Sequence, residues 1–559
     1  MKLLQRAQGV WNWYLEIKDT PVFVYLELFI VLVLSFVYFY IYQFASTHLC
    51  GTDAYYHIKF SYLTRTEGII HEFPWAQFSF WRDNFFDKEF LYHLYLSLFT
   101  YGDLIEGAKW ATLTIGCSIF TFFFLMLRLN GVRYRWLWWF LLLSSGGYLL
   151  FRINVTRPQT LSVLLLIIGL HFLINERYWI VGFLSFLYSL SYTGHYQYVG
   201  LSLIFLLVVG LKERRWPWRV FVWAVGGMLF GWVIHPNFPN NVEGFFVQNV
   251  LVIFNHMQQT VNLNMGGELN PMSTRSLLNV CSASLIPLWL IFTISFLRPF
   301  KPSTKTIFLF AASTVYLVLM MISKRFGEYW VPVTGLFIAF YFSDLPQDLT
   351  LGYWWKSRRW VFGILLAVIL VGVPVLFIRS HFDTYRQLER CGESNYAPSA
   401  RWVDKNIPPG ETILTCDWDD APHLFFHAHR HKYTVFLDPT FMYNWNPELW
   451  KRWNKLANGK DPKPVQTITD YFKVNYLYCT GDFRAFRKQM SKTDGAFLIY
   501  PRPRPGAQGI ACAVNTDCPD GTICKNEECE QGKPCAKKTG RCVKDPHVFI
   551  IKVRSPEAR

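Results

Sequence analysis

The side chains best placed for chemistry lie where apolar runs end. Asp53 follows an apolar stretch from about 22 to 45 by eight residues, in the segment GTDAYYHIKF. A carboxylate at the end of a membrane span is held at the depth of the lipid headgroups, where ionisable groups are usually functional. The position of Asp53 therefore predicts chemistry on the polar head of a lipid-linked molecule.

A second set of candidates is cationic. Arg152 and Arg157 bracket the turn FRINVTRPQT, and Lys324 and Arg325 lie in ISKRFGEYWVP. A guanidinium group can bind two phosphate oxygens at once, so these turns predict a site for a lipid phosphate or pyrophosphate. The alternative is cations that extend to the headgroups. His195, in SYTGHYQYVG, is expected either to face the same cavity or to be a hydrogen-bonded core histidine.

The third candidate is Glu268, in a loop from about 235 to 276 that ends NMGGELNPMSTRS. Gly266, Gly267 and Pro271 give this segment a backbone that can bend into a cavity. The alternative is a solvated loop acid.

The loop from about 47 to 109 adds an aromatic and acidic group. Tyr56 and His57 follow Asp53, and the stretch FPWAQFSFWRDNFFDKEFLYH contains Asp83, Asp87, Glu89 and His93. The alternative is an interfacial belt of aromatic side chains beside solvated acids, which we favour for Asp83 and Glu89.

The elements that must position these residues are membrane spans. The chain has 559 residues, 52% of them hydrophobic and 18% aromatic, and apolar runs recur through its first two thirds. The fold class expected is a polytopic α-helical membrane protein, with a transmembrane domain over residues 1–379. We expect about eleven spans, near residues 22–46, 110–127, 136–151, 158–174, 178–192, 196–211, 218–234, 277–297, 306–322, 329–343 and 360–378.

The distribution of charge predicts the orientation. If the N-terminus is cytoplasmic, Lys and Arg concentrate in the short inner segments, as the positive-inside bias requires. The formal net charge of +16 then reports topology, and the clustered basic face of a nucleic-acid-binding protein is missing. We expect a multi-pass protein of the cell (inner) membrane, without a cleaved signal peptide, whose C-terminal domain is periplasmic.

Residues 380–559 are polar enough for an α/β domain outside the cytoplasm. Strand-like runs (ETILTC, YTVFLDP, VNYLYC, AFLIY, VFIIKV) alternate with helical ones (SARWVDKNI, NPELWKRWNKLA, VQTITDYF, RAFRKQM). Six of the twelve cysteines crowd into residues 506–546, a segment too polar to build a core. We expect three disulfides there in an oxidising compartment, with zinc as the alternative, in a Cys-rich insertion within a β-hairpin loop.

Taken together, these segments resemble one family. GTDAYYHIKFSYLTRTEG and FPWAQFSFWRDNFFD are similar to the first external loop of the catalytic subunit of oligosaccharyltransferases. LYSLSYTGHYQYVGLSL is similar to the family's Trp-Gly-Gly-Tyr region, and GGELNPMS to its Ser-x-x-Glu-x-x-Pro loop. KRFGEYWVPV is similar to its arginine segment, and residues 399–439 resemble the start of its external domain.

The resemblance implies a GT-C integral-membrane glycosyltransferase, which takes a sugar from a polyprenyl phosphate or pyrophosphate carrier. Asp53 would be a metal ligand or base at the acceptor, Glu268 would support metal and acceptor, and Arg325 would bind phosphate. A divalent cation, Mg or Mn, would fit these oxygen ligands. Contacts to donor or acceptor would come from Tyr56, His57 and Trp418, and phosphate contacts also from Arg157, Lys324 and His195.

Two departures from the family pattern matter. The family's second acidic metal motif is missing from RINVTRPQT, so either Asp87 replaces it or no metal binds. CDWDDAP, with Asp417, Trp418, Asp419 and Asp420, stands where the family has Trp-Trp-Asp-Tyr-Gly. A lipid or a growing polysaccharide is therefore at least as plausible an acceptor as a peptide. Two other classes stay open: a transporter or flippase of lipid-linked sugars, and a non-catalytic membrane scaffold whose outer domain binds partners.

Overall fold

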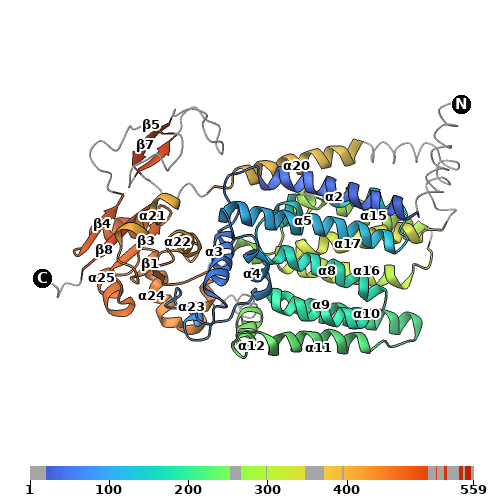
Figure 1. The fold of residues 1–559 in the computed structure, drawn as a ribbon, viewed down its shortest axis with the longest axis horizontal. Helices are drawn as coiled ribbons and strands as arrows, with labels where there is room; N and C mark the ends of the chain where they lie inside the picture. Colours follow the sequence, from blue (N-terminus) through green and yellow to red (C-terminus); the bar gives the residue numbers. More distant parts are fainter. Residues whose placement is uncertain are drawn as a thin grey trace.

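A computed structural model describes the chain at residues 20–145, 147–251, 266–297, 299–346, 371–392, 396–501, 511–512, 522–525, 540–544 and 548–554. Long helices run side by side along one direction, and an α/β domain lies at one end of them (Figure 1). The long helices are α2 (Pro21–Gln43), α5 (Leu104–Leu129), α8 (Pro158–Ile174), α9 (Tyr178–Ser191), α10 (Tyr196–Glu213), α11 (Arg219–Ile234), α15 (Ser282–Leu297), α16 (Thr304–Ile322), α17 (Gly327–Asp344) and α20 (Val373–Glu389). Two shorter helices, α6 (Arg135–Leu143) and α7 (Gly147–Ile153), lie between α5 and α8 in the sequence.

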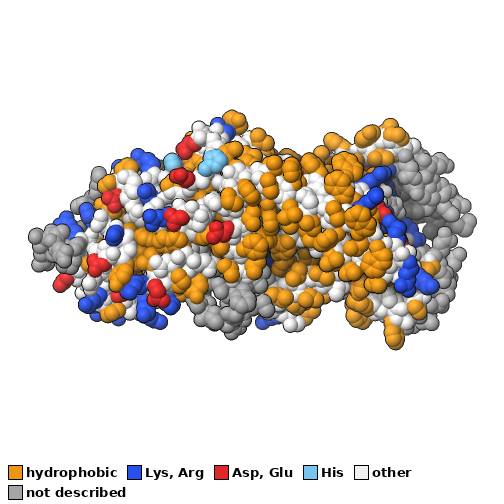
Figure 2. All heavy atoms as spheres, turned by 90° about the horizontal axis from the view of Figure 1, so that it is seen from below, with side chains coloured by type: hydrophobic (Ala, Val, Ile, Leu, Met, Phe, Trp, Pro, Cys, Tyr) orange, Lys and Arg blue, Asp and Glu red, His pale blue; other side chains and the backbone are white. Residues whose placement is uncertain are grey.

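The surface of this helical part is apolar. Hydrophobic side chains cover it as a broad band, and charged side chains gather over the α/β domain and near the opposite end (Figure 2). Helix α2 shows why: Val22, Tyr25 and Phe29 are exposed in a helix that is apolar on all sides. A helix of that kind is stable facing lipid and not water, so these helices form a membrane domain.

Length and apolar composition identify four described helices that could cross a membrane: α2, α5, residues 193–213 and α16. The predicted span 136–151 is instead two helices, α6 and α7, bent by 82°. The sequence Ser-Ser-Gly-Gly at 144–147 lies at this break, and Gly/Ser pairs are common kink sites. The predicted span 360–378 lies largely outside the described residues. Eleven spans stay a prediction.

The α/β domain is built on a five-stranded sheet with strand order β2-β1-β3-β8-β4. Its strands are β1 (Thr412–Thr415), β2 (Lys432–Tyr433), β3 (Tyr476–Thr480), β4 (Ala496–Tyr500) and β8 (Val548–Val553). Strand β1 is parallel to β2 and β3, whereas β8 is antiparallel to β3 and β4. Its helices are α21 (Ala397–Asn406), α22 (Asp420–Ala428), α23 (Pro439–Trp445), α24 (Pro447–Ala457), α25 (Pro464–Gln466) and α26 (Arg484–Met490).

These elements match four of the five predicted strands and the four predicted helical runs. The fifth predicted strand, YTVFLDP, is wrong except at Tyr433, because β2 ends there. The pairing of β4 with β8 also gives the expected hairpin around the Cys-rich segment. Three short described strands of that segment, β5 (Ala511–Cys512), β6 (Thr522–Lys525) and β7 (Gly540–Lys544), form an antiparallel sheet. The predicted three disulfides fall outside the described residues and stay a prediction. So do the domain limits, although α20 runs through the predicted boundary at 379–380.

The loop at 47–109 joins the two parts of the molecule. It contains α3 (Thr52–Glu67), the short helix η1 (Phe80–Arg82) and α4 (Phe90–Ser97). Phe73, Trp81 and Phe85 are buried in one core with Phe425 and Tyr433 of the α/β domain. The aromatic stretch is thus a domain interface and not an interfacial belt.

Two disulfides unforeseen in the sequence tie this region together. Cys50, just before α3, pairs with Cys391 after α20, with a Cα–Cα distance of 5.2 Å. Cys416, after β1, pairs with Cys479 on the neighbouring strand β3. Such pairs are typical of an oxidising compartment, which agrees with the predicted side of the membrane for the α/β domain.

Candidate active site

Helix α3 places Asp53 in its first turn, after a glycine that the turn requires. Gly51 has φ +83°, in the left-handed region that favours glycine, and a Cβ there would lie 3.3 Å from Val155 Cγ1 and 3.5 Å from Arg157 Nη2. This close approach brings Asp53 onto the turn between α7 and α8, where Arg157 Nη2 lies 3.3 Å from Asp53 Oδ2.

Glu268 lies at the centre of three arginines. Its Oε2 accepts hydrogen bonds from Arg152 Nη1 at 2.6 Å and Arg157 Nη1 at 2.9 Å, and its Oε1 accepts one from Arg325 Nη2. Arg152 also donates from Nε to Glu328 Oε1 at 2.5 Å. The turns that carry the phosphate-binding candidates therefore converge on one carboxylate, and we call Asp53, Arg152, Arg157, Glu268 and Arg325 the charged cluster.

Backbone contacts hold the Glu268 turn against the Arg325 turn. The Glu268 turn is the short helix η4 (Gly267–Leu269), and the Arg325 turn is η5 (Lys324–Phe326). Ser323 Oγ donates to the Glu268 carbonyl at 3.2 Å, and the Lys324 amide donates to the Asn270 carbonyl at 3.0 Å. The third turn lies between α7 and α8. Pro158 begins α8, and Arg157 is the residue just before it. Two separate chain segments thus present guanidinium groups to the carboxylate that a third segment supplies.

The guanidinium groups keep free donors. Arg152 Nη2, Arg157 Nε and Arg325 Nε are buried nitrogens without a hydrogen-bond partner in the described structure. Buried polar groups in proteins are nearly always paired, and an unpaired donor beside a charge is costly. Three such donors around one carboxylate are what an anion with several oxygens, such as a phosphate, would satisfy.

Charge keeps Glu268 ionised. Burial by itself raises the pKa of this carboxyl, but the charges of Arg325, Arg157 and Arg152 hold the pKa well below its ordinary value. Asp53 and Arg325 are the more open members, with side chains 26% and 30% exposed. The cluster is therefore partly open at these two residues.

A carboxyl of the α/β domain reaches the same end of α3. Thr52 Oγ1 donates to Asp419 Oδ1 at 2.8 Å, just before helix α22 begins. Burial, and then the charge of Asp53, raises the pKa of Asp419 to about 7. A carboxyl with a pKa near neutrality can exchange protons at working pH, so Asp419 is a functional candidate that the sequence supplied only as part of CDWDDAP.

Several predicted residues lie elsewhere. Asp87 accepts hydrogen bonds from His93 Nδ1 at 2.8 and 2.9 Å, and no contact joins it to the charged cluster in the described structure. His195 is buried; its Nδ1 lies 3.0 Å from the Tyr192 carbonyl, and Trp232 Nε1 donates to its Nε2 at 3.0 Å. It is the hydrogen-bonded core histidine of the second interpretation.

The predicted substrate contacts are mostly covered. Tyr56 is fully buried and packs against Phe425 and Phe436, while His57 is 4% exposed. Trp418 is half-buried beside the α/β core. The ammonium of Lys324 lies near Gly267, at the edge of the charged cluster.

The predicted ligand set for Mg or Mn, which is Asp53, Glu268 and Asp87, does not fit a divalent cation as arranged. Asp87 is held by His93, and both oxygens of Glu268 are bound by guanidinium groups. A cation would have to replace positive charges already in contact with these oxygens, at a large Coulombic cost. The missing acidic motif in RINVTRPQT also disfavours a divalent cation there, because that turn carries arginines and no acid.

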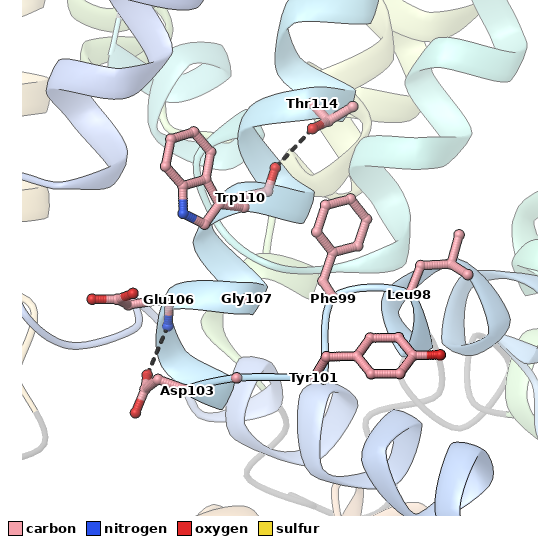
Figure 3. A pocket seen from close by; sticks show the side chains of 9 residues that line it. Leu98, Phe99, Tyr101, Asp103, Glu106, Gly107, Trp110 and Thr114 are labelled. Atoms are coloured by element: carbon pink, nitrogen blue, oxygen red, sulfur yellow. Dashed lines mark hydrogen bonds between the residues drawn. The ribbon is translucent and has the colours of Figure 1, made fainter.

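A pocket of about 370 Å³ lies apart from these residues, at the start of α5, between Tyr101, Glu106 and Trp110 (Figure 3). It contains none of the predicted site residues, and Asp103 there serves to cap α5 through the Glu106 amide. The Asp103 carboxylate therefore has a local structural role.

Solved structures share this architecture. The oligosaccharyltransferase AglB of Archaeoglobus fulgidus, solved with an inhibitory peptide and a dolichol-phosphate, matches with a TM-score of 0.58 and 12% identity, over 86% of this chain and 74% of that one. ArnT from Cupriavidus metallidurans, bound to undecaprenyl phosphate, matches with 0.52 and 14%, over 84% and 95%. The arabinofuranosyltransferase AftD from Mycobacteria matches with 0.53 and 12%, over 95% and 40%.

The chain shares the fold of these solved structures. The resemblance to oligosaccharyltransferases is thereby confirmed at the level of the fold, whereas sequence identities of 12–14% do not establish the activity. No family model matches the sequence, and no curated protein matches it. The function of this fold in this chain therefore depends on its own side chains.

Proposed function

We propose that this protein is a glycosyltransferase. It transfers a sugar or oligosaccharide from a polyprenyl phosphate or pyrophosphate carrier to an acceptor on the outer face of the membrane. The observation that carries the proposal is the charged cluster, in which three guanidinium groups each keep a buried nitrogen without a partner. Two of the structures that share the fold were solved with a polyprenyl-type phosphate, which supports a lipid-linked donor.

The donor phosphate would bind between Arg157 and Arg325. Their unpaired Nε atoms supply N–H donors, and the guanidinium charges stabilise the negative charge that grows on the phosphate as it leaves. Glu268 keeps the three arginines together in the absence of donor, because its ionised carboxylate bonds all three. Without it, their mutual repulsion would separate the turns.

Asp53 would act on the acceptor side. It lies 3.3 Å from Arg157, so a bound phosphate and a bound acceptor would be neighbours. The acceptor oxygen attacks the anomeric carbon, the bond from that carbon to the phosphate oxygen breaks, and the proton of the acceptor passes to Asp53. Asp419, beside Thr52, is a second carboxyl that can take part in that transfer. The two carboxyls on this side, Asp53 and Asp419, favour a neutral hydroxyl acceptor, such as a lipid or a polysaccharide end.

The topology predicted from charge completes the proposal. With the N-terminus in the cytoplasm of a cell (inner) membrane, the charged cluster and the α/β domain face the periplasm, where polyprenyl-linked sugars are consumed. The two disulfides beside the first loop fit that oxidising side.

The test uses the purified full chain in liposomes with radiolabelled polyprenyl-linked sugars. We expect donor cleavage by the wild type and its loss in Asp53→Asn, while Asp103→Asn, a cap outside the charged cluster, keeps it. Transport of intact donor without cleavage would identify a flippase. The absence of both transport and cleavage would identify a scaffold. Either result overturns the proposal.

A further inference from the structure

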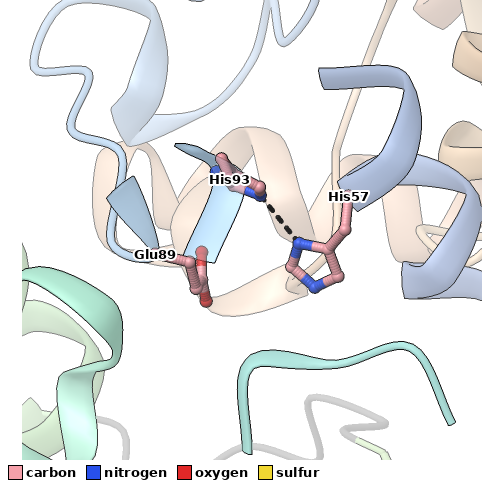
Figure 4. A group of neighbouring side chains, drawn as sticks. All are labelled: His57, Glu89 and His93. Atoms are coloured by element: carbon pink, nitrogen blue, oxygen red, sulfur yellow. Dashed lines mark hydrogen bonds between the residues drawn. The ribbon is translucent and has the colours of Figure 1, made fainter. Parts of the chain in front are cut away.

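A second group of polar side chains lies within the first loop, outside the charged cluster. His57 projects from α3, four residues after Asp53, while Glu89 and His93 lie four residues apart at the start of α4. Residues four apart share a helix face. One atom of each of the three side chains lies within 4.8 Å of those of the other two, and Figure 4 shows the side chains around a common space.

The contacts of this group leave one ligand position open. His57 Nδ1 and His93 Nε2 are 2.9 Å apart, so a single proton between them satisfies both nitrogens. Lys88 Nζ lies 3.5 Å from Glu89 Oε1, but Glu89 Oε2 is buried without a hydrogen-bond partner in the described structure. Glu89 is 3% exposed and His93 is fully buried. Lys88 thus pairs with one oxygen of Glu89, and the other oxygen, beside two imidazoles, is left without a partner.

The surroundings are those of a metal-binding histidine. His93 Nδ1 is held by both oxygens of Asp87, at 2.8 and 2.9 Å, which leaves Nε2 to face His57 and Glu89. Histidines that bind metals almost always have their other nitrogen fixed by a carboxylate or a carbonyl in this way. Asp87 is fixed in turn, because its amide donates to Asn237 Oδ1 at 3.0 Å.

We propose that His57, Glu89 and His93 bind one divalent first-row transition metal ion of the Zn²⁺ class. Two imidazoles and one carboxylate are a known ligand set for zinc, whereas Mg²⁺ prefers oxygen ligands alone. With bonds of about 2.0–2.1 Å, tetrahedral ligand atoms lie about 3.3 Å apart. The two imidazole nitrogens would separate by a few tenths of an ångström, and the Glu89 carboxylate would move closer.

The metal would fasten two helices of the first loop. It would connect α3, which carries Asp53 one turn before His57, to the start of α4. Its role is therefore to position α3 and the loop, and none of its three ligands takes part in the proposed transfer reaction. The ion belongs to this group and not to the charged cluster.

The test is metal binding by the full chain in detergent, after removal of metal with a chelator. We expect about one equivalent of Zn²⁺ by elemental analysis, and visible Co²⁺ absorption bands of a tetrahedral site. His93→Ala and Glu89→Gln should lose this equivalent, whereas His71→Ala, which removes an exposed histidine of the same loop, should keep it. Any Co²⁺ bound elsewhere, such as at the cysteines, contributes equally in all variants. The difference between the wild type and a ligand variant therefore reports this site alone.

Asp87→Asn provides a second measurement that keeps all three ligands. We expect its Zn²⁺ affinity to fall roughly 10–100-fold, because His93 would lose the partner that orients it. The proposal is overturned if the wild type binds no more metal than His93→Ala or Glu89→Gln. That result would leave the proposed transferase untouched, because metal content is measured without donor or acceptor.

Discussion

Replacing Arg157 by lysine is the most direct test of the charged cluster. Arg157 contacts Asp53 at 3.3 Å and Glu268 at 2.9 Å through different nitrogens, and its Nε is buried and unpaired. Lysine keeps the positive charge but has one ammonium group, which cannot reproduce the planar fork of guanidinium. The Arg157→Lys protein should therefore fold, while its donor phosphate loses one or two charge-assisted hydrogen bonds.

The expected size of the effect follows from those bonds. Each is worth about 1.5–3 kcal/mol, so the loss of one bond raises the barrier by about 1.5–3 kcal/mol and the loss of two by about 3–6 kcal/mol. That corresponds to a decrease in kcat/KM of at least roughly 10-fold, and of roughly 150-fold or more if both bonds are lost. We would measure initial rates of donor cleavage in liposomes over a range of donor concentrations, and detergent thermal unfolding in parallel.

Arg177→Lys is the matched control, because Arg177 is exposed in the turn between α8 and α9, at the opposite end of α8 from Arg157. Its kcat/KM should equal that of the wild type. If Arg157→Lys also equals the wild type, the unpaired nitrogens are not a phosphate site and the reasoning is refuted. A loss of unfolding temperature that matches the loss of rate would show a folding defect, and that too would contradict the assignment.

Three further predictions concern the residues that position the charged cluster. Gly51→Ala should lower stability by about 1 kcal/mol or more because of its positive φ, and it should reduce donor cleavage because a Cβ crowds Val155 and Arg157. The control Gly68→Ala, at φ +93° in open space, should show the loss of stability alone. Equal cleavage rates in the two variants would contradict this prediction. Cys391→Ala should lower the thermal unfolding temperature, because it removes the disulfide to Cys50. Reductant should then lower that temperature by less than it does in the wild type. Cys117→Ala, which removes a free buried cysteine, should respond to reductant as the wild type does. Asp419 has a pKa of about 7 in the folded state and near 4 in the unfolded state. The folded state therefore binds more protons between these values, and stability falls as the pH rises from about 4 to 7. Asp419→Asn should flatten that part of the profile of stability against pH, and an unchanged profile would count against the raised pKa.

The residue types and their spacing already predicted much of this protein. Apolar runs identified the membrane class, because burial in lipid imposes a composition that any segment carries by itself. Alternation and turn residues identified four of the five strands of the α/β domain, for the same local reason. The candidates Asp53, Arg157 and Arg325 stood out because charges at the ends of spans are unusual there, and Glu268 because glycines and a proline flank it in its loop.

What the tertiary structure decided is which of these segments meet. Arg152, Arg157 and Arg325 all bond Glu268, which lies more than a hundred residues from the first two, and Asp419 bonds Thr52 across 367 residues. Asp87 was the predicted replacement for the missing acidic metal motif, yet it accepts a hydrogen bond from His93 in a separate buried group. Local patterns report how one segment meets water or lipid, but contacts between distant loops depend on how all the helices pack, and no single segment encodes that packing.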